Sequence, residues 1–183
     1  MNPLLTEAAT AAMHCADDEI QRMVASSIEA LKQARQHIET WKAELAQGRS
    51  LAACLMLDPS HLARCHQLAR SLCDRGDFLL ALPLAMFCAC YESDKPDHSF
   101  LTGACLQRLG QPAAAAQFYR TALQLNEADA ASAYRLGECL EATGQCEDAG
   151  HLYQWTVDLA RGNFALRRLQ DMASERLARL QLA

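Results

Sequence analysis

Small residues recur every 34 positions through the middle of this 183-residue chain. Glycine or alanine at a fixed position lets two helix backbones approach closely, and a glycine just after a helix takes a left-handed conformation at little cost. The recurrence therefore predicts a series of helix pairs built on one plan. Three sets of residues show the 34-residue step: Ala69, Gly103 and Gly137; Gly76, Gly110 and Gly144; and Ala81, Ala115 and Ala149.

A period of this length is typical of tetratricopeptide repeats, in which each unit is an antiparallel pair of helices. We place three repeats at 62–95, 96–129 and 130–163. After Gly162, leucines gather on one side of a helical pattern and arginines mainly on the other, which predicts a capping helix. The expected fold is all-α: three repeats in a superhelical array, with an N-terminal amphipathic helix and a C-terminal capping helix.

Composition supports a helical binding protein. Aromatic residues make up only 6% of the chain, and alanine and leucine dominate its apolar half, which favours helices. The net charge of −5 argues against a nucleic-acid surface. No stretch approaches the ~18 uninterrupted apolar residues of a membrane span. The first residues also lack the basic start and apolar core of a secretory signal.

Nine cysteines are scattered through the chain without regular spacing, and an odd count disfavours a disulfide framework. We interpret them as reduced thiols that act as small apolar side chains, which indicates a reducing cytoplasm. Two groups are alternative metal ligands, but no second pair stands at zinc-ligand spacing, so we expect neither a metal nor another cofactor. The two groups are Cys88 with Cys90, and His61 with Cys65 and His66.

A helical pattern runs from Asp17 to about Gln47, with apolar residues recurring every seven positions. Such a seam predicts a coiled-coil helix that joins two copies of the chain; the alternative is an amphipathic helix folded back onto the repeats. We divide the chain into 1–60, an N-terminal helical segment for dimerisation, and 61–183, the repeat domain. The candidate dimerisation residues are Val24, Leu31, Ile38, Trp41 and Leu45.

The first helix of each repeat is expected to line a concave groove, with side chains spaced at three, four and three residues pointing inward. A groove across three such helices would hold an extended peptide of roughly six to nine residues. We interpret Phe100 and Tyr134 as its walls, although either ring could instead pack between repeats. Arg70, which would face Glu138 and Glu141 across the groove, either selects ligand charge or is simply solvated. The candidate groove residues are Ala63, His66, Arg70, Cys73, Phe100, Ala104, Gln107, Tyr134 and Glu138.

Three segments resemble one known family. The stretch 103–111 (GACLQRLGQ), the lead-in 47–53 (QGRSLAA) with Leu57-Asp58-Pro59, and 136–140 (LGECL) are similar to class II translocator chaperones of bacterial type III secretion, the LcrH/SycD type. The resemblance spans roughly 45–182 in order. The chain departs from it in having His66 and Cys73 where the family usually has tyrosines, and in its longer N-terminal helix.

The resemblance implies a chaperone of the bacterial cytoplasm, connected with virulence and without enzymatic activity. Such chaperones often form homodimers through their N-terminal helices. They keep hydrophobic pore-forming translocators soluble before secretion, with an extended client segment in the concave groove. Neither nucleic acid nor stable membrane insertion is expected.

Other functions fit less well. An adaptor or co-chaperone for needle or export-apparatus subunits is the main alternative, since those proteins share the repeat fold. A heat-shock co-chaperone would need a Lys-Asn-Arg clamp, and only Arg135 has suitable chemistry at the corresponding positions. An enzyme is disfavoured because we find no glycine-rich phosphate loop, no paired carboxylates on one face and no nucleophile with a base.

Overall fold

The computed structural model describes Thr40 and residues 42–181. The chain divides into two compact units, 1–49 and 50–183. In the first unit, the described residues are helical up to Ala46, and Leu45 is 43% exposed. The other candidate dimerisation residues, Val24, Leu31, Ile38 and Trp41, lie outside the described residues.

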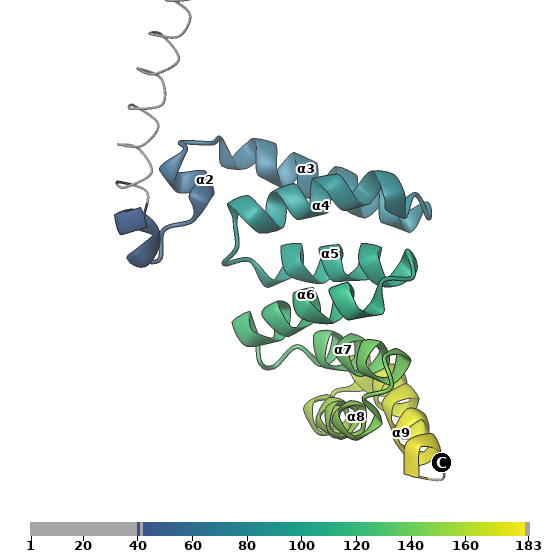
Figure 1. The fold of residues 1–183 in the computed structure, drawn as a ribbon. Helices are drawn as coiled ribbons and strands as arrows, with labels where there is room; N and C mark the ends of the chain where they lie inside the picture. Colours follow the sequence, from purple (N-terminus) through teal and green to yellow (C-terminus); the bar gives the residue numbers. More distant parts are fainter. Residues whose placement is uncertain (1–39, 41, 182–183) are drawn as a thin grey trace, which may run out of the picture. The chain divides into compact units, whose positions relative to one another are not determined.

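The second unit is a row of helices. Six of them form three antiparallel hairpins that stack in sequence order (Figure 1). They coincide to within a few residues with the predicted repeats, and the all-α fold is confirmed. The elements are α2 Leu51–Cys54, α3 Pro59–Asp74, α4 Phe78–Tyr91, α5 Pro96–Arg108, α6 Pro112–Leu125, α7 Ala130–Ala142, α8 Cys146–Ala160, the 3₁₀ turn η1 Phe164–Leu166 and α9 Arg167–Gln181.

Helix ends carry recognisable start and stop residues. Pro96 opens α5, at a position where the missing backbone N–H costs nothing. The Asp129 carboxylate caps α7 by accepting hydrogen bonds from the backbone N–H groups two and three residues further on. Gly144, just after α7, has a φ of +80°, which side chains disfavour. These residues set the lengths of the hairpins and hence the 34-residue period.

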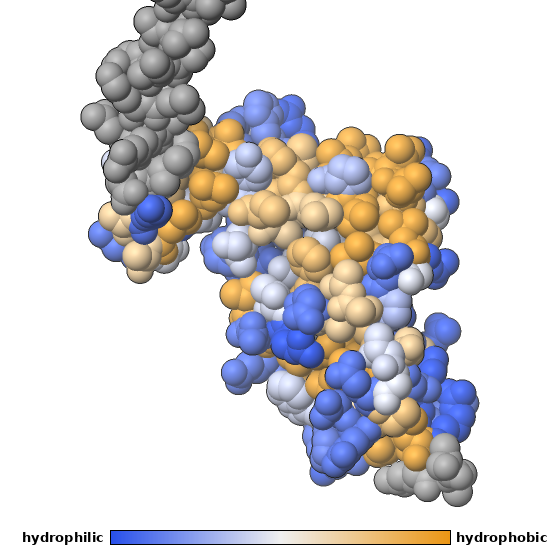
Figure 2. Space-filling model, viewed as in Figure 1, coloured by the Kyte–Doolittle hydropathy of each residue, from blue (hydrophilic) through white to orange (hydrophobic). Residues whose placement is uncertain are grey.

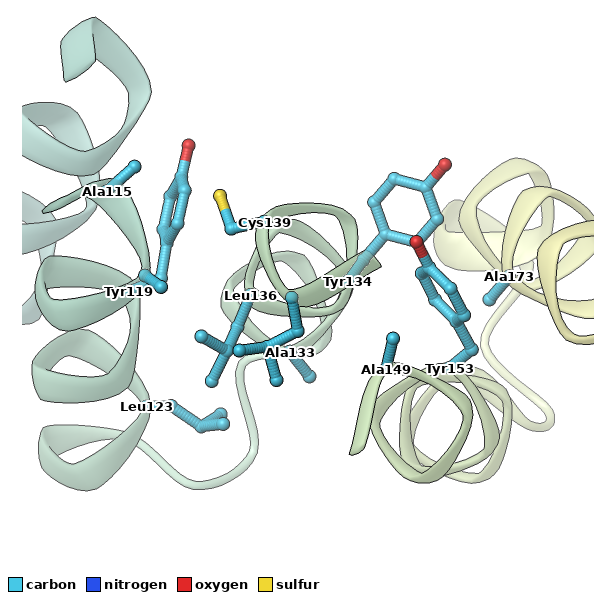
Figure 3. Packing of buried hydrophobic residues seen from close by; sticks show 12 residues of the cluster. Ala115, Tyr119, Leu123, Ala133, Tyr134, Leu136, Cys139, Ala149, Tyr153 and Ala173 are labelled. Carbon is cyan, nitrogen blue, oxygen red and sulfur yellow. The ribbon is translucent and has the colours of Figure 1, made fainter. Parts of the chain in front are cut away.

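The core of the second and third hairpins contains a buried tyrosine in each, Tyr119 and Tyr153 (Figure 3), and each ring lies against a glycine of the first helix. A Cβ atom at Gly137 would lie 2.8 Å from Cε1 of Tyr153, and one at Gly103 would lie 3.0 Å from the ring of Tyr119. Both tyrosines are completely buried. The first helix of each pair therefore needs glycine because the ring of the second helix occupies the space of a side chain.

The capping helix α9 packs against both α8 and α7. Ala173 is completely buried there, and Leu169, Leu177 and Leu180 pack against the core of the last hairpin. The predicted cap is confirmed. Among the described residues, no helix has the length and apolarity to cross a membrane.

Candidate functional site

A cleft of about 370 Å³ opens along α3, α5 and the start of α7. These are the first helices of the three hairpins, as expected for a concave repeat surface. Helices α3 and α5 contact each other directly, although α4 lies between them in the sequence, and together they form most of the cleft wall. The cleft is lined by His66, Arg70, Cys73, Asp74, Asp97, Phe100, Leu101, Ala104, Asp129 and Ala131.

Five of the nine candidate groove residues line this cleft: His66, Arg70, Cys73, Phe100 and Ala104. They come from two helices, yet the same spacing rule selected all of them. A helix turns by the same angle at each residue, so side chains three or four positions apart share a face wherever the helix packs. The sequence pattern thus located the α3 and α5 walls of the cleft.

Phe100 supplies the largest apolar wall. Its ring meets that of Tyr119 edge to face, with centroids 5.4 Å apart, and remains only partly buried. Leu101 and Ala104 extend the apolar surface along α5, and Ala131 adds to it from α7. One side of Phe100 is therefore anchored in the core while the other is offered to the cleft, so both interpretations of this residue hold in part.

Charged groups surround the apolar wall. Arg70 is exposed on α3, and Asp74, Asp97 and Asp129 line the same cleft. The carboxylate of Asp129 is already engaged in capping α7. The cleft therefore combines an apolar wall with more acidic than basic groups, a composition suited to peptide N–H donors and apolar side chains.

A chain of hydrogen bonds holds His66 at the edge of the cleft. Its Nδ1 lies 2.9 Å from Nδ1 of the buried His98, whose Nε2 lies 2.9 Å from a carboxylate oxygen of Glu92. With both rings neutral, His98 donates to Glu92 through Nε2–H, so its Nδ1 accepts from Nδ1–H of His66. Partial burial, followed by the nearby His98, lowers the pKa of His66.

Tyr134 does not wall the cleft, contrary to our expectation. Its side chain is 2% exposed and packs against Tyr153, with ring centroids 5.6 Å apart. Figure 3 shows both rings between α7, α8 and the capping helix. The capping helix α9 packs on α7 at this ring, and Arg176 of α9 interacts with the Tyr134 side chain. Tyr134 therefore follows the alternative interpretation and belongs to the core.

Gln107 and Glu138 are tied into a polar network beyond the cleft. The amide of Gln107 donates to Glu138 over 3.1 Å, and Arg135 pairs with the same carboxylate at 2.8 Å. Arg176 of α9 lies 3.6 Å from Glu138 and 3.1 Å from Glu141.

The carboxylates expected opposite Arg70 are thus paired with the capping helix. Arg70 therefore lacks the predicted partners across the groove, as the solvated interpretation of this residue anticipated. Ala63 is exposed on α3 outside the cleft lining.

The cysteines behave as small buried or surface side chains. Seven cysteines of the described region are free thiols: Cys65, Cys73, Cys88, Cys90, Cys105, Cys139 and Cys146. Cys88 is completely buried and Cys90 is exposed, so this pair does not share one site. Among the described residues, no three His, Cys, Asp or Glu side chains come close enough to hold a metal ion. Among the cysteines of the described region, Cys73 differs in that it lines the cleft. Its sulfur lies 3.2 Å from that of Cys105.

Sequence reasoning missed several residues of the site. Leu101 and Asp74 are sequence neighbours of inward positions, and Asp129 enters from a helix cap rather than a helix face. The cap was recognisable as an acidic residue before a run of small helix formers. The partnership of His66 with His98 had no sequence signal, since it depends on how two helices pack.

No family model matches the chain, and no curated protein matches its sequence. Solved structures do match. A T3SS complex from Aeromonas hydrophila is 21% identical with a TM-score of 0.75, and the match covers 79% of this chain and 96% of that one. The Yersinia enterocolitica type III secretion chaperone SycD, in complex with a peptide of the translocator YopD, is 18% identical with a TM-score of 0.67, over 69% and 96%.

A third similar structure is PcrH in complex with the chaperone-binding region of PopD, and a crystal structure of PcrH from Pseudomonas aeruginosa also matches. The complex is 19% identical with a TM-score of 0.66, covering 69% of this chain and 95% of that one. The three matches share one architecture at low identity. This chain has the fold of the translocator chaperones of type III secretion.

Proposed function

We propose that this protein is a chaperone for type III secretion translocators and binds an extended apolar segment of its client in the cleft along α3, α5 and α7. The observation that carries the proposal is the cleft itself, with the partly exposed ring of Phe100 beside Leu101, Ala104 and Ala131. The similar SycD and PcrH structures support it, since they are complexes with a translocator peptide or chaperone-binding region.

The dimensions and chemistry of the cleft suit such a segment. Three inner helices spaced about 10 Å apart span some 20–30 Å, which an extended chain of roughly six to nine residues fills. Burying one Leu-sized or Pro-sized side chain against the Phe100 wall contributes about 1.5–3 kcal/mol. Three such anchors, after the cost of association, give a dissociation constant in the micromolar range, about −8 kcal/mol.

The chain is proposed to work by binding rather than catalysis, and to do so in the bacterial cytoplasm. His66, the histidine that lines the cleft, is hydrogen-bonded to the buried His98, which in turn is bonded to Glu92. An apolar client segment held in the cleft is removed from water before secretion, which is the task of a holding chaperone.

Residues 1–60 are proposed to form the dimerisation segment, through the apolar seam of Val24, Leu31, Ile38, Trp41 and Leu45. The exposure of Leu45, at 43%, leaves this end of the seam free for a partner. Deleting residues 1–46 is expected to give a monomer by light scattering whose repeats stay folded, with a helical circular dichroism spectrum and a cooperative thermal transition. A truncated protein that remains dimeric would place the interface on the repeats.

The experiment that tests the function is co-expression with hydrophobic translocators of the same secretion locus, followed by size-exclusion chromatography with light scattering. We expect a soluble complex that contains an otherwise insoluble translocator. The full-length protein with Ala104→Arg, which fills the cleft, is the matched control and should leave the translocator insoluble. If needle or export subunits co-elute while every translocator stays insoluble, the client assignment is wrong and the adaptor function replaces it.

A further inference from the structure

Two thiols meet at the boundary between cleft and core. The Sγ atoms of Cys73 on α3 and Cys105 on α5 lie 3.2 Å apart, although 32 positions separate the residues in sequence. A disulfide bond measures about 2.05 Å, so a relative shift of roughly 1 Å brings the sulfurs to bonding distance. The next repeat differs: Cys139, one repeat after Cys105, is equally buried, but the position that corresponds to Cys73 is occupied by Gln107.

The two thiols differ in access. Cys73 is half-buried and lines the open cleft, whereas Cys105 is completely buried beneath it. Burial, reinforced by the neighbouring thiol of Cys73, raises the pKa of Cys105 to about 12. Cys105 is therefore protected from direct attack, while Cys73 is open to small solutes that enter from the cleft.

We propose that Cys73 and Cys105 form a reversible disulfide that ties α3 to α5 beneath the cleft, with a small-molecule disulfide such as oxidised glutathione as the oxidant. This modification site is independent of the identity of any client. It goes beyond the binding function, because it makes the wall of the cleft sensitive to redox conditions.

The reaction balances as two thiol–disulfide exchanges. The Cys73 thiolate attacks one sulfur of oxidised glutathione, forms a mixed disulfide and releases one glutathione thiolate, which takes up a proton. The Cys105 sulfur, losing its proton to solvent, then attacks Sγ of Cys73 and expels the second glutathione. One molecule of oxidised glutathione is thereby reduced to two thiols while the two cysteine thiols are oxidised to one disulfide.

The test treats the full-length protein with equimolar reduced and oxidised glutathione, blocks the remaining thiols by alkylation and maps the tryptic peptides by mass spectrometry. Trypsin releases Cys73 in peptide 71–75 and Cys105 in peptide 76–108, because Pro96 prevents cleavage after Lys95. We expect these two peptides to be recovered joined, with the loss of two hydrogen atoms. We also expect the thermal midpoint to rise, since the link closes a loop.

Three variants decide which sulfurs are joined, because peptide 76–108 also contains Cys88 and Cys90. Cys105→Ser and Cys73→Ser should each abolish the joined product, whereas Cys139→Ser should retain it. The same treatment of the protein unfolded in guanidinium should scatter the links among the cysteines. Recovery of Cys73 only as an alkylated thiol or a glutathione adduct would overturn the proposal, as would a link that survives Cys105→Ser.

Discussion

The first hairpin and the two that follow it share one backbone plan but pack it differently. The second and third hairpins set a buried tyrosine of the outer helix against a glycine of the inner helix, Tyr119 on Gly103 and Tyr153 on Gly137. At the corresponding positions, the first hairpin has Ala85 and Ala69, both completely buried. The same 34-residue period is therefore compatible with two ways of packing the helices of a hairpin closely. One sets a tyrosine against a glycine, and the other has alanine at both positions.

This difference extends to the inner surface. In the tyrosine hairpins, the phenol reaches across to the inner helix: Tyr119 donates to Gln107 and Tyr153 to Glu141. The first hairpin has no phenol there, and the corresponding inner residue is Cys73, free to face the cleft. The first hairpin, with alanine in place of the tyrosine, thus presents the thiol of Cys73 in the candidate binding surface.

The outer surface also differs. Helix α4 is apolar on nearly all sides, and Leu79 and Leu80 are 72% and 63% exposed. Figure 2 shows apolar surface gathered over this helix. Outer helices α6 and α8 bury their apolar side chains more completely and expose polar ones. The first hairpin therefore has the smaller core and the more apolar exterior.

The largest expected effect is the loss of the tyrosine packing. Tyr153→Ala should lower the free energy of unfolding by about 3–5 kcal/mol, because it leaves a large cavity. Gly137→Ala in the wild-type background should also destabilise, by about 1–3 kcal/mol, since its Cβ meets the tyrosine ring. In the Tyr153→Ala background, which reproduces the alanine pair of the first hairpin, the same change should become neutral or stabilising by up to about 1 kcal/mol.

The free energies of unfolding of wild type, the two single variants and the double variant form a double-mutant cycle, which urea unfolding followed by circular dichroism measures. Additive effects of the two substitutions would show that the Tyr153 ring does not occupy the space of a side chain at Gly137. The steric explanation of the glycine that recurs every 34 residues would then be wrong.

The next effect separates two aromatic residues one repeat apart. Phe100→Ala should weaken binding of a client peptide by about 1.5–3 kcal/mol, roughly tenfold to a hundredfold, with a smaller loss of stability. Tyr134→Ala should instead destabilise the fold and leave the affinity of the folded protein nearly unchanged, because its ring is 2% exposed. Calorimetric titration together with thermal unfolding distinguishes the two. Reversed effects would mean that the cleft extends over α7.

A smaller effect compares the two phenol hydrogen bonds. The Tyr153 hydroxyl donates to the carboxylate of Glu141 over 2.6 Å, whereas Tyr119 donates to the neutral amide of Gln107 over 2.9 Å. Tyr153→Phe should therefore cost about 1.5–3 kcal/mol and Tyr119→Phe about 0.5–1.5 kcal/mol of unfolding free energy. Equal losses in urea unfolding would contradict the stronger bond in the third hairpin.

The smallest effect is a pH dependence in the first hairpin. His98, Asp97, Arg70 and Glu92 surround His66, whose pKa is lowered from 6.5 by burial and then by His98. Below pH 6.5 the unfolded chain therefore binds more protons at this residue than the folded chain, so its contribution to stability is lost as the pH falls. Wild type should lose more stability than His66→Gln in urea unfolding below this pH. A stability gap between the two proteins that stays constant with pH would show that His66 is unperturbed.

Periodicity was sufficient to predict the hairpins, their caps and five residues of the cleft, because helix geometry determines which side chains share a face. It failed at Tyr134, since the covering helix α9 is a tertiary contact that a repeat pattern does not encode. The pairings of His66 with His98 and of Cys73 with Cys105 were also beyond sequence reasoning. Both depend on side-chain conformations between helices of neighbouring hairpins.

The most direct test compares two alanine-to-arginine substitutions within one hairpin. Ala104 on α5 lines the cleft, whereas Ala114 on α6 is exposed outside it. The affinity of each full-length variant is measured for a translocator segment that co-elutes with wild type. We predict that Ala104→Arg reduces affinity at least tenfold with an unchanged helical spectrum, while Ala114→Arg binds like wild type. Equal affinity of the two variants would contradict binding in the cleft.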